Sequence, residues 1–99
     1  PIYSNVLGEI ILQLVARKFR GTLNVGSLRP CSKYQFGRSL AKIFGLDSSL
    51  ISAGSIGDHV FTAKRPGCLS LNVDKASQMG IELPTYQISL ERFRQDNYC

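Results

Sequence analysis

Apolar and polar residues follow the period of an α-helix in three parts of the chain, residues 4–19, 32–44 and 86–96. In each part, large apolar side chains recur three or four residues apart, which places them on one face of a helix. The expected inward-facing residues are Val6, Leu7, Ile10, Ile11, Leu14 and Val15; then Phe36, Leu40, Ile43 and Phe44; and finally Tyr86, Leu90 and Phe93. We therefore predict three amphipathic helices around one core, with Gly8 allowing a close contact with another helix.

The predicted helices are flanked by residues that commonly cap the start of a helix or end it. Ser32 followed by Gln35 has the sequence of a capping box. Thr85 is suited to cap the last helix, as Ser4 or Asn5 is suited to cap the first. Glycine often adopts the left-handed conformation just past a helix, so we expect the first two helices to stop at glycines 21 and 45.

Shorter patterns predict smaller elements between the long helices. Residues 74–79 predict a short helix, and residues 22–26 alternate like a strand. Residues 60–63 and 69–71 can form short strands or extended segments on either side of a turn. About four helices with a few short strands indicate an α+β fold in a single domain that covers the whole chain.

The composition is that of a small folded domain. The chain has 99 residues, of which 43% are hydrophobic, and no apolar run reaches the roughly 18 residues of a membrane span. We therefore expect no membrane partner.

The net charge of +5 fits three interpretations. It can belong to an ordinary solvated surface, to a site for an anionic ligand such as a sugar nucleotide, or to a nucleic-acid-binding surface. The basic residues are spread along the chain instead of forming one stripe with interleaved aromatic residues. This distribution argues against nucleic acid as a partner.

The cysteines and the histidine point to no metal site. Cys31, Cys68 and Cys99 are odd in number and have neither disulfide-framework nor zinc spacing. A reducing cytoplasm is the simplest compartment for such a chain. Asp58–His59 is an acid–imidazole pair without a nucleophile motif, so we interpret it as part of a loop and predict no catalytic residue.

Residues 64–84, KRPGCLSLNVDKASQMGIELP, contain the candidate binding residues. Arg65 is a permanent cation whose planar set of donors suits phosphate or carboxylate, and Pro66 stiffens the turn that presents it. The alternative for Arg65 is an ion pair at a domain joint. Asn72 is the second candidate, and its alternative role is to cap the short helix, as Asp74 also can.

The same segment resembles a known family. The pattern R-P-G-x-x-x-L-N-x-x-K, followed by G-I-x-L-P, resembles the C-terminal region of sugar-nucleotide reductases of the dTDP-4-dehydrorhamnose reductase type, which are extended short-chain dehydrogenases. Residues 21–26, GTLNVG, resemble the G-x-Y-H-x-x-G strand of that family. Residues 32–41, SKYQFGRSLA, resemble its S-x-Y-E-x-A-x-x-I-A helix. The ordered similarity covers residues 1–93, nearly the whole chain.

The resemblance implies that this chain is the substrate-binding lobe, with Arg65 near the nucleotide–diphosphate part of the substrate. The intact enzyme would transfer a hydride from NADPH or NADH to a 4-keto sugar, with a tyrosine as the proton donor. Lys75 matches a lysine of the family that we expect to be structural. Asp96 lies near the place of an acidic residue that helps to bind magnesium at a dimer interface in some relatives.

Two parts of the family's machinery are missing from this sequence. No G-x-x-G-x-x-G turn follows a strand, and the catalytic Tyr-x-x-x-Lys pair is absent, because Arg38 stands four residues after Tyr34. We therefore expect a piece of a longer protein that binds no cofactor itself and does not catalyse alone. Its expected partners are the missing Rossmann domain and the nucleotide sugar, and a homodimer can form through surface left uncovered.

Two other classes of function stay open. The chain can be a non-catalytic interaction module of a reductase relative, such as the regulatory subunit of methionine adenosyltransferase. It can also be an independent small basic domain that binds nucleic acid. Whether the parent protein is an enzyme is therefore uncertain from the sequence.

Overall fold

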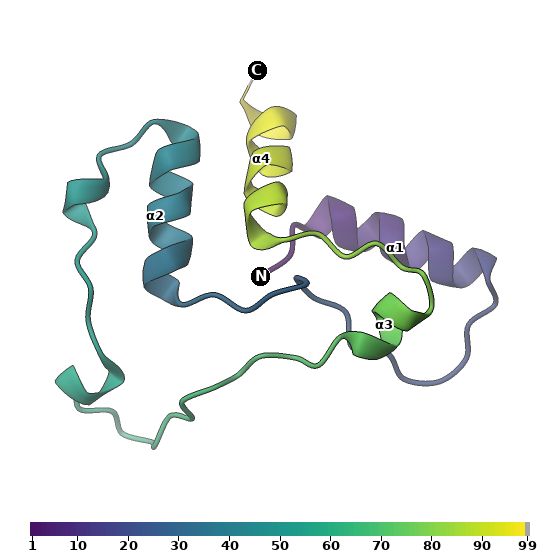
Figure 1. Ribbon diagram of the computed structural model, residues 1–99, viewed down its shortest axis with the longest axis horizontal. Coiled ribbons are helices and arrows are strands. Elements are labelled where there is room, and N and C mark those ends of the chain that lie inside the picture. Colours follow the sequence, from purple (N-terminus) through teal and green to yellow (C-terminus); the bar gives the residue numbers. More distant parts are fainter. Residues whose placement is uncertain (99) are drawn as a thin grey trace.

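The computed structural model describes residues 1–98 as helices joined by irregular segments (Figure 1). The elements are α1 (Ser4–Ala16), α2 (Lys33–Phe44), the 3₁₀ turns η1 (Ser48–Leu50) and η2 (Ile56–Asp58), α3 (Asp74–Gln78) and α4 (Tyr86–Asn97). Helix accounts for 49% of the structure, and the described residues contain no strand. The prediction of an α+β fold was therefore wrong in its β part.

The predicted strands lack a partner that could complete a ladder. Residues 22–26 form neither helix nor strand, and the carbonyl of Thr22 accepts from Lys75 Nζ at 3.1 Å. Residues 60–63 and 69–71 lie within residues 52–72, all of which are exposed. An alternating apolar pattern forms a sheet only where a second strand supplies the hydrogen bonds, and none does so in residues 1–98.

The helix-end predictions for α2 and α4 are confirmed. The backbone N–H of Gln35 donates to Ser32 Oγ at 3.0 Å, and the N–H of Ser32 donates to Gln35 Oε1 at 2.9 Å, which completes the capping box. Gly45 follows α2 with a φ of 67°, in the left-handed conformation. Thr85 Oγ1 accepts from the N–H of Ile88 at 3.3 Å at the start of α4.

Both ends of α1 differ from the prediction. Tyr3 occupies the N-cap position without a side-chain cap, so neither Ser4 nor Asn5 caps this helix. At the other end, Lys18 takes a φ of 52°, and the N–H of Phe19 bonds to the carbonyl of Leu14 at 3.0 Å. This hydrogen-bonded turn ends the helix at Ala16, several residues before Gly21.

The interior of α1 also differs. A β-carbon at Gly8 would meet nothing within 4 Å among the described residues, so the predicted close helix contact at this glycine is not made.

The larger buried cluster lies between α1, α3 and the segment that follows α3. Its buried members are Val6, Ile10, Val73, Ala76, Ile81 and Leu83. The predicted stripe of α1 is thus only partly buried, since Ile11 and Val15 on the same helix are exposed. The core buries one narrow face of this helix, with Leu14 half-buried against it, while Ile11, Leu12 and Val15 remain exposed.

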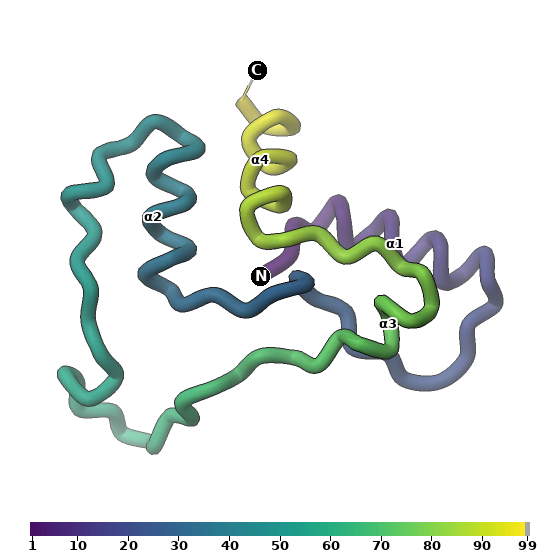
Figure 2. Tube along the Cα trace, in the orientation of Figure 1, coloured from purple at the N-terminus to yellow at the C-terminus, as the bar shows by residue number. Residues whose placement is uncertain are grey.

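A second packed region joins α2 to α4, which run side by side (Figures 1 and 2). Leu90 and Ala41 are buried there, and the ring of Phe93 lies 5.9 Å from that of Phe44, centroid to centroid. Offset or tilted ring pairs at this separation are favourable. The aromatic residues predicted to face inward from these two helices therefore meet one another.

The chain is more extended than a compact domain of its length. Its radius of gyration is 16.1 Å, whereas about 13 Å is usual for 100 residues. The tube in Figure 2 shows the cause, because the chain between α2 and α3 swings out in a wide loop away from the helices. Among the described helices, none has both the length and the apolar composition needed to cross a bilayer.

Candidate functional site

Arg65 lies on the exposed segment between η2 and α3. Its guanidinium carbon is 4.6 Å from the ring centroid of Phe61, a cation–π distance. The ring of His59 is 6.1 Å from that of Phe61, so the three side chains form a local cluster. The ion pair found within residues 1–98 joins two other residues, so the structure gives Arg65 no carboxylate partner in this part of the chain.

Asn72 lies just before α3, and its side chain forms a hydrogen bond with the backbone at the start of that helix. Its Oδ1 accepts a hydrogen bond from the N–H of Asp74 at 2.9 Å, which satisfies a donor at the start of the helix. Its backbone carbonyl also accepts from Asn24 Nδ2 at 3.4 Å. Val73 occupies the N-cap position of α3 without a side-chain cap, and Asn72, one residue earlier, supplies the hydrogen bond to the N–H of Asp74. No hydrogen bond links Asn72 with Arg65, and a ligand contact by its free amide group stays a prediction.

Lys75, on α3, is exposed but contacts the chain that follows α1. Besides its hydrogen bond to Thr22, its Nζ lies 5.6 Å from the ring centroid of Phe19. Both contacts tie α3 to the chain that follows α1, as expected of a structural lysine.

Asp58 and His59 do not act as a pair. Asp58 Oδ2 accepts from the N–H of Ser55 at 2.7 Å and so caps η2, while the ring of His59 lies near Phe61. Two adjacent residues thus point to separate partners, which fits their interpretation as loop residues.

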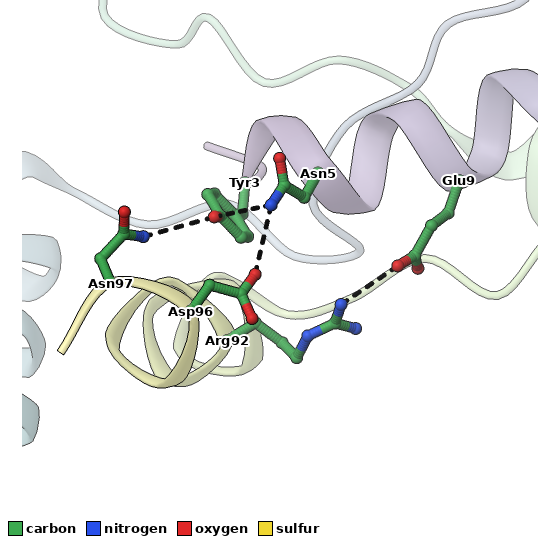
Figure 3. A network of polar contacts seen from close by, with 6 residues as sticks. All are labelled: Tyr3, Asn5, Glu9, Arg92, Asp96 and Asn97. Atoms are coloured by element: carbon green, nitrogen blue, oxygen red, sulfur yellow. Dashed lines mark hydrogen bonds and ion pairs between the residues drawn. The ribbon is translucent and has the colours of Figure 1, made fainter. Parts of the chain in front are cut away.

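Asp96 belongs to a polar network that links α4 to α1 (Figure 3). Its Oδ2 accepts from Asn5 Nδ2 at 3.2 Å, and the same amide donates to Tyr3 Oη at 2.9 Å. Tyr3 Oη also accepts from Asn97 Nδ2 at 3.4 Å. No group of three or more potential metal ligands gathers within residues 1–98.

The same figure shows the ion pair between α1 and α4. Arg92 Nη2 lies 3.0 Å from Glu9 Oε1. The hydrogen bond and the charge of Glu9 raise the pKa of the Arg92 guanidinium above its ordinary value. Both side chains are substantially exposed, so the pair orients the helices more than it stabilises them.

The arrangement of α2 against η1 contains a pocket that sequence reasoning did not find. It has a volume of about 310 Å³ and is lined by Arg38, Ser39, Lys42, Leu46 and Ser48. Arg38 Nη1 donates to Tyr34 Oη at 3.1 Å, so the Tyr34–Arg38 pair noted in the sequence is a real contact on one face of α2. The signal that could have found the pocket is the spacing of four residues between Arg38 and Lys42.

Two further hollows are mainly apolar. A groove of about 670 Å³ runs between α1, α4 and the segment after α3, with Ile10, Leu28 and Ile88 among its lining residues. A cavity of about 200 Å³ between α2, α4 and the start of the chain is lined by Ile2, Leu40 and their neighbours. The polar lining of the groove includes Glu9, Glu82 and Arg92, of which Glu9 and Arg92 form an ion pair.

Comparison of the chain with protein-family models, curated proteins and solved structures finds no match. Its function therefore has to be argued from its own motifs and geometry.

Proposed function

We propose that this chain is the sugar-nucleotide-binding part of an NAD(P)H-dependent reductase that acts on 4-keto-6-deoxy sugar nucleotides, similar to dTDP-4-dehydrorhamnose reductase. The ordered motifs of residues 21–26, 32–41 and 64–84 support this assignment. The observation that carries it is the state of Arg65, a guanidinium stacked on an aromatic ring in an exposed segment, with no ion pair in the described residues.

Stacking prepares Arg65 for a diphosphate. The guanidinium lies over the face of Phe61, and its five N–H donors form a planar set. Two of these donors can bind two oxygens of a phosphate group at once. The ring also limits the rotamers of the arginine, so less conformational freedom is lost when the ligand binds.

The remaining parts of the reaction belong to the proposed Rossmann domain. That domain would hold NADPH or NADH and the tyrosine that donates the proton, while this chain holds the nucleotide end of the substrate. Ile11, Leu12 and Val15 on α1 are exposed, and they offer an apolar surface that a second domain could cover.

Cys31 and Cys68 are free thiols, in keeping with a cytoplasmic location.

A titration of the isotope-labelled chain with dTDP-glucose, followed by NMR, tests the proposal. We expect saturable shifts of the backbone amides near Phe61 and Arg65. Replacing Arg65 by alanine should weaken binding by about 1–3 kcal/mol, the range for losing a hydrogen bond to a charged group.

The matched control is Lys64→Ala, which removes the same charge from the neighbouring exposed position. It should leave the affinity nearly unchanged. Equal losses in the two variants would show a general charge effect, and no shift near Arg65 with the sugar nucleotide would refute the proposal.

A further inference from the structure

A second basic site, separate from Arg65, lies in the pocket between α2 and η1. Arg38 and Lys42 are four residues apart on α2, so their side chains leave the helix on the same side, with β-carbons about 6 Å apart. Both residues line the pocket, and so do Ser39 and Ser48. Leu46 contributes the apolar part of the wall.

The charge of this pocket is not balanced by nearby acids. None of the seven acidic residues of the chain lines it, and neither Arg38 nor Lys42 forms an ion pair with a residue between 1 and 98. Asp47, between Leu46 and Ser48 in the sequence, does not line the pocket, and its Oδ1 accepts from the N–H of Ser49 at 2.9 Å. Two cations that face one hollow without a carboxylate repel each other, and a bound anion would relieve that repulsion.

Arg38 is already positioned for an anion. Its Nη1 donates to Tyr34 Oη at 3.1 Å, and its guanidinium carbon lies 5.7 Å from the centroid of the same ring. Tyr34 therefore occupies one donor and holds the side chain along the helix, while the remaining N–H groups keep their hydrogen-bonding capacity.

The hydroxyl groups add uncharged donors to the same wall. Ser39 Oγ donates a long hydrogen bond of 3.4 Å to Tyr86 Oη, which it could exchange for a stronger charge-assisted one. Ser48 supplies a second hydroxyl from η1.

We propose that this pocket binds the phosphate group of a small molecule. Arg38 and Lys42 supply the charge, and the two serines supply hydrogen bonds to the remaining oxygens. The volume of the pocket suits one phosphate or a diphosphate with a small attached group, which separates it from an extended nucleic-acid surface. The site uses no residue of the Arg65 cluster, so it can exist whether or not the chain binds sugar nucleotides.

The test is an NMR titration of the labelled 99-residue chain with inorganic phosphate and with pyrophosphate, at constant ionic strength maintained with chloride. Saturable amide shifts should gather in residues 38–48, and pyrophosphate should bind more tightly because it carries more charge. Arg38→Gln and Lys42→Gln should each weaken pyrophosphate binding by about tenfold, the loss expected for one charge-assisted hydrogen bond. Glutamine is a good helix former, so α2 should remain intact.

Two controls make the outcome decisive. Lys33→Gln removes a cation from α2 that does not line the pocket, and Arg65→Ala removes the cation of the other site. Both should keep pyrophosphate affinity within about twofold, since exposed charges outside the site act only through a screened field. Shifts that never saturate, or equal losses in Lys33→Gln and Lys42→Gln, would overturn the proposal.

Discussion

At the scale of the residue, the side chains with unusual chemistry are positioned by near neighbours in the sequence. Arg65 stacks on Phe61, Arg38 bonds to Tyr34, and Cys68 lies 3.5 Å from the hydroxyl of Ser70. The type of Arg65 and the proline after it made it a candidate from sequence alone. The aromatic ring beneath it could not be foreseen, because the path of an irregular segment follows from no periodic pattern.

Cys68 offers a prediction at this scale. It is exposed, and its hydrogen bond with Ser70 lowers the pKa of the thiol below its ordinary value. A lower pKa means more thiolate at neutral pH, and the thiolate is the species that reacts. Ser70→Ala should therefore raise this pKa and slow the alkylation of Cys68 severalfold near neutral pH.

Mass spectrometry of the peptide that contains Cys68, sampled during reaction with iodoacetamide across a pH series, measures the effect. Cys31 in the same sample is the internal reference, and its rate should not change. An identical pH profile for Cys68 in both proteins would mean that Ser70 does not influence the thiol.

At the scale of the element, local signals were reliable and signals that need a distant partner were not. The start and the end of α2 were predicted correctly, because each depends on residues within a few positions of each other. These features are the capping box of Ser32 and Gln35 and the left-handed Gly45. The strand predicted at residues 22–26 required a neighbouring strand, and none of the described residues provides one. The end of α1 was missed because Lys18 adopts a conformation that more commonly belongs to glycine.

Two glycines allow the same substitution to be compared in opposite settings. Gly8 is inside α1 with open space around its missing β-carbon, so Gly8→Ala should raise the free energy of unfolding by about 0.5–1 kcal/mol. Gly45 has a φ of 67°, which is unfavourable for alanine. Gly45→Ala should therefore lower the free energy of unfolding by about 1–2 kcal/mol, although there is room for a methyl group.

Urea denaturation followed by circular dichroism measures both changes. A shift of the two midpoints in the same direction would contradict the backbone assignment at one of the glycines. Gly8 lies outside both candidate sites, whereas the N–H of Gly45 bonds to the carbonyl of Lys42, so Gly8→Ala is the variant that reports on stability independently of binding.

At the scale of the whole molecule, the fold consists of two modest packed regions and a wide loop. One region joins α1 to α3, and the other joins α2 to α4. Few large side chains are fully buried, and Ile10 is the largest of them. A core this small leaves little margin against the loss of any one member.

Ile10→Ala should therefore lower the free energy of unfolding by about 2–5 kcal/mol, the usual cost of such a cavity. Since the total stability of small domains is of that order, we expect much of the helical signal to be lost at room temperature. Circular dichroism with a denaturation series measures the change.

Leu12→Ala is the matched control on the same helix, because Leu12 is 70% exposed whereas Ile10 is 2% exposed. Leu12→Ala should change the free energy of unfolding by no more than about 0.5 kcal/mol. A comparable loss in both variants would instead reveal that the outer face of α1 is covered in solution, as in a homodimer.

The exposed course of residues 52–72 has a consequence for how this chain can diversify. Lengthening such a segment costs only chain entropy, which grows with the logarithm of its length. Insertions, deletions or exchanged sequences there would leave the helices able to assemble as before. Descendants of this chain could therefore acquire new ligand preferences by replacing one loop, while natural selection for folding acted on the rest.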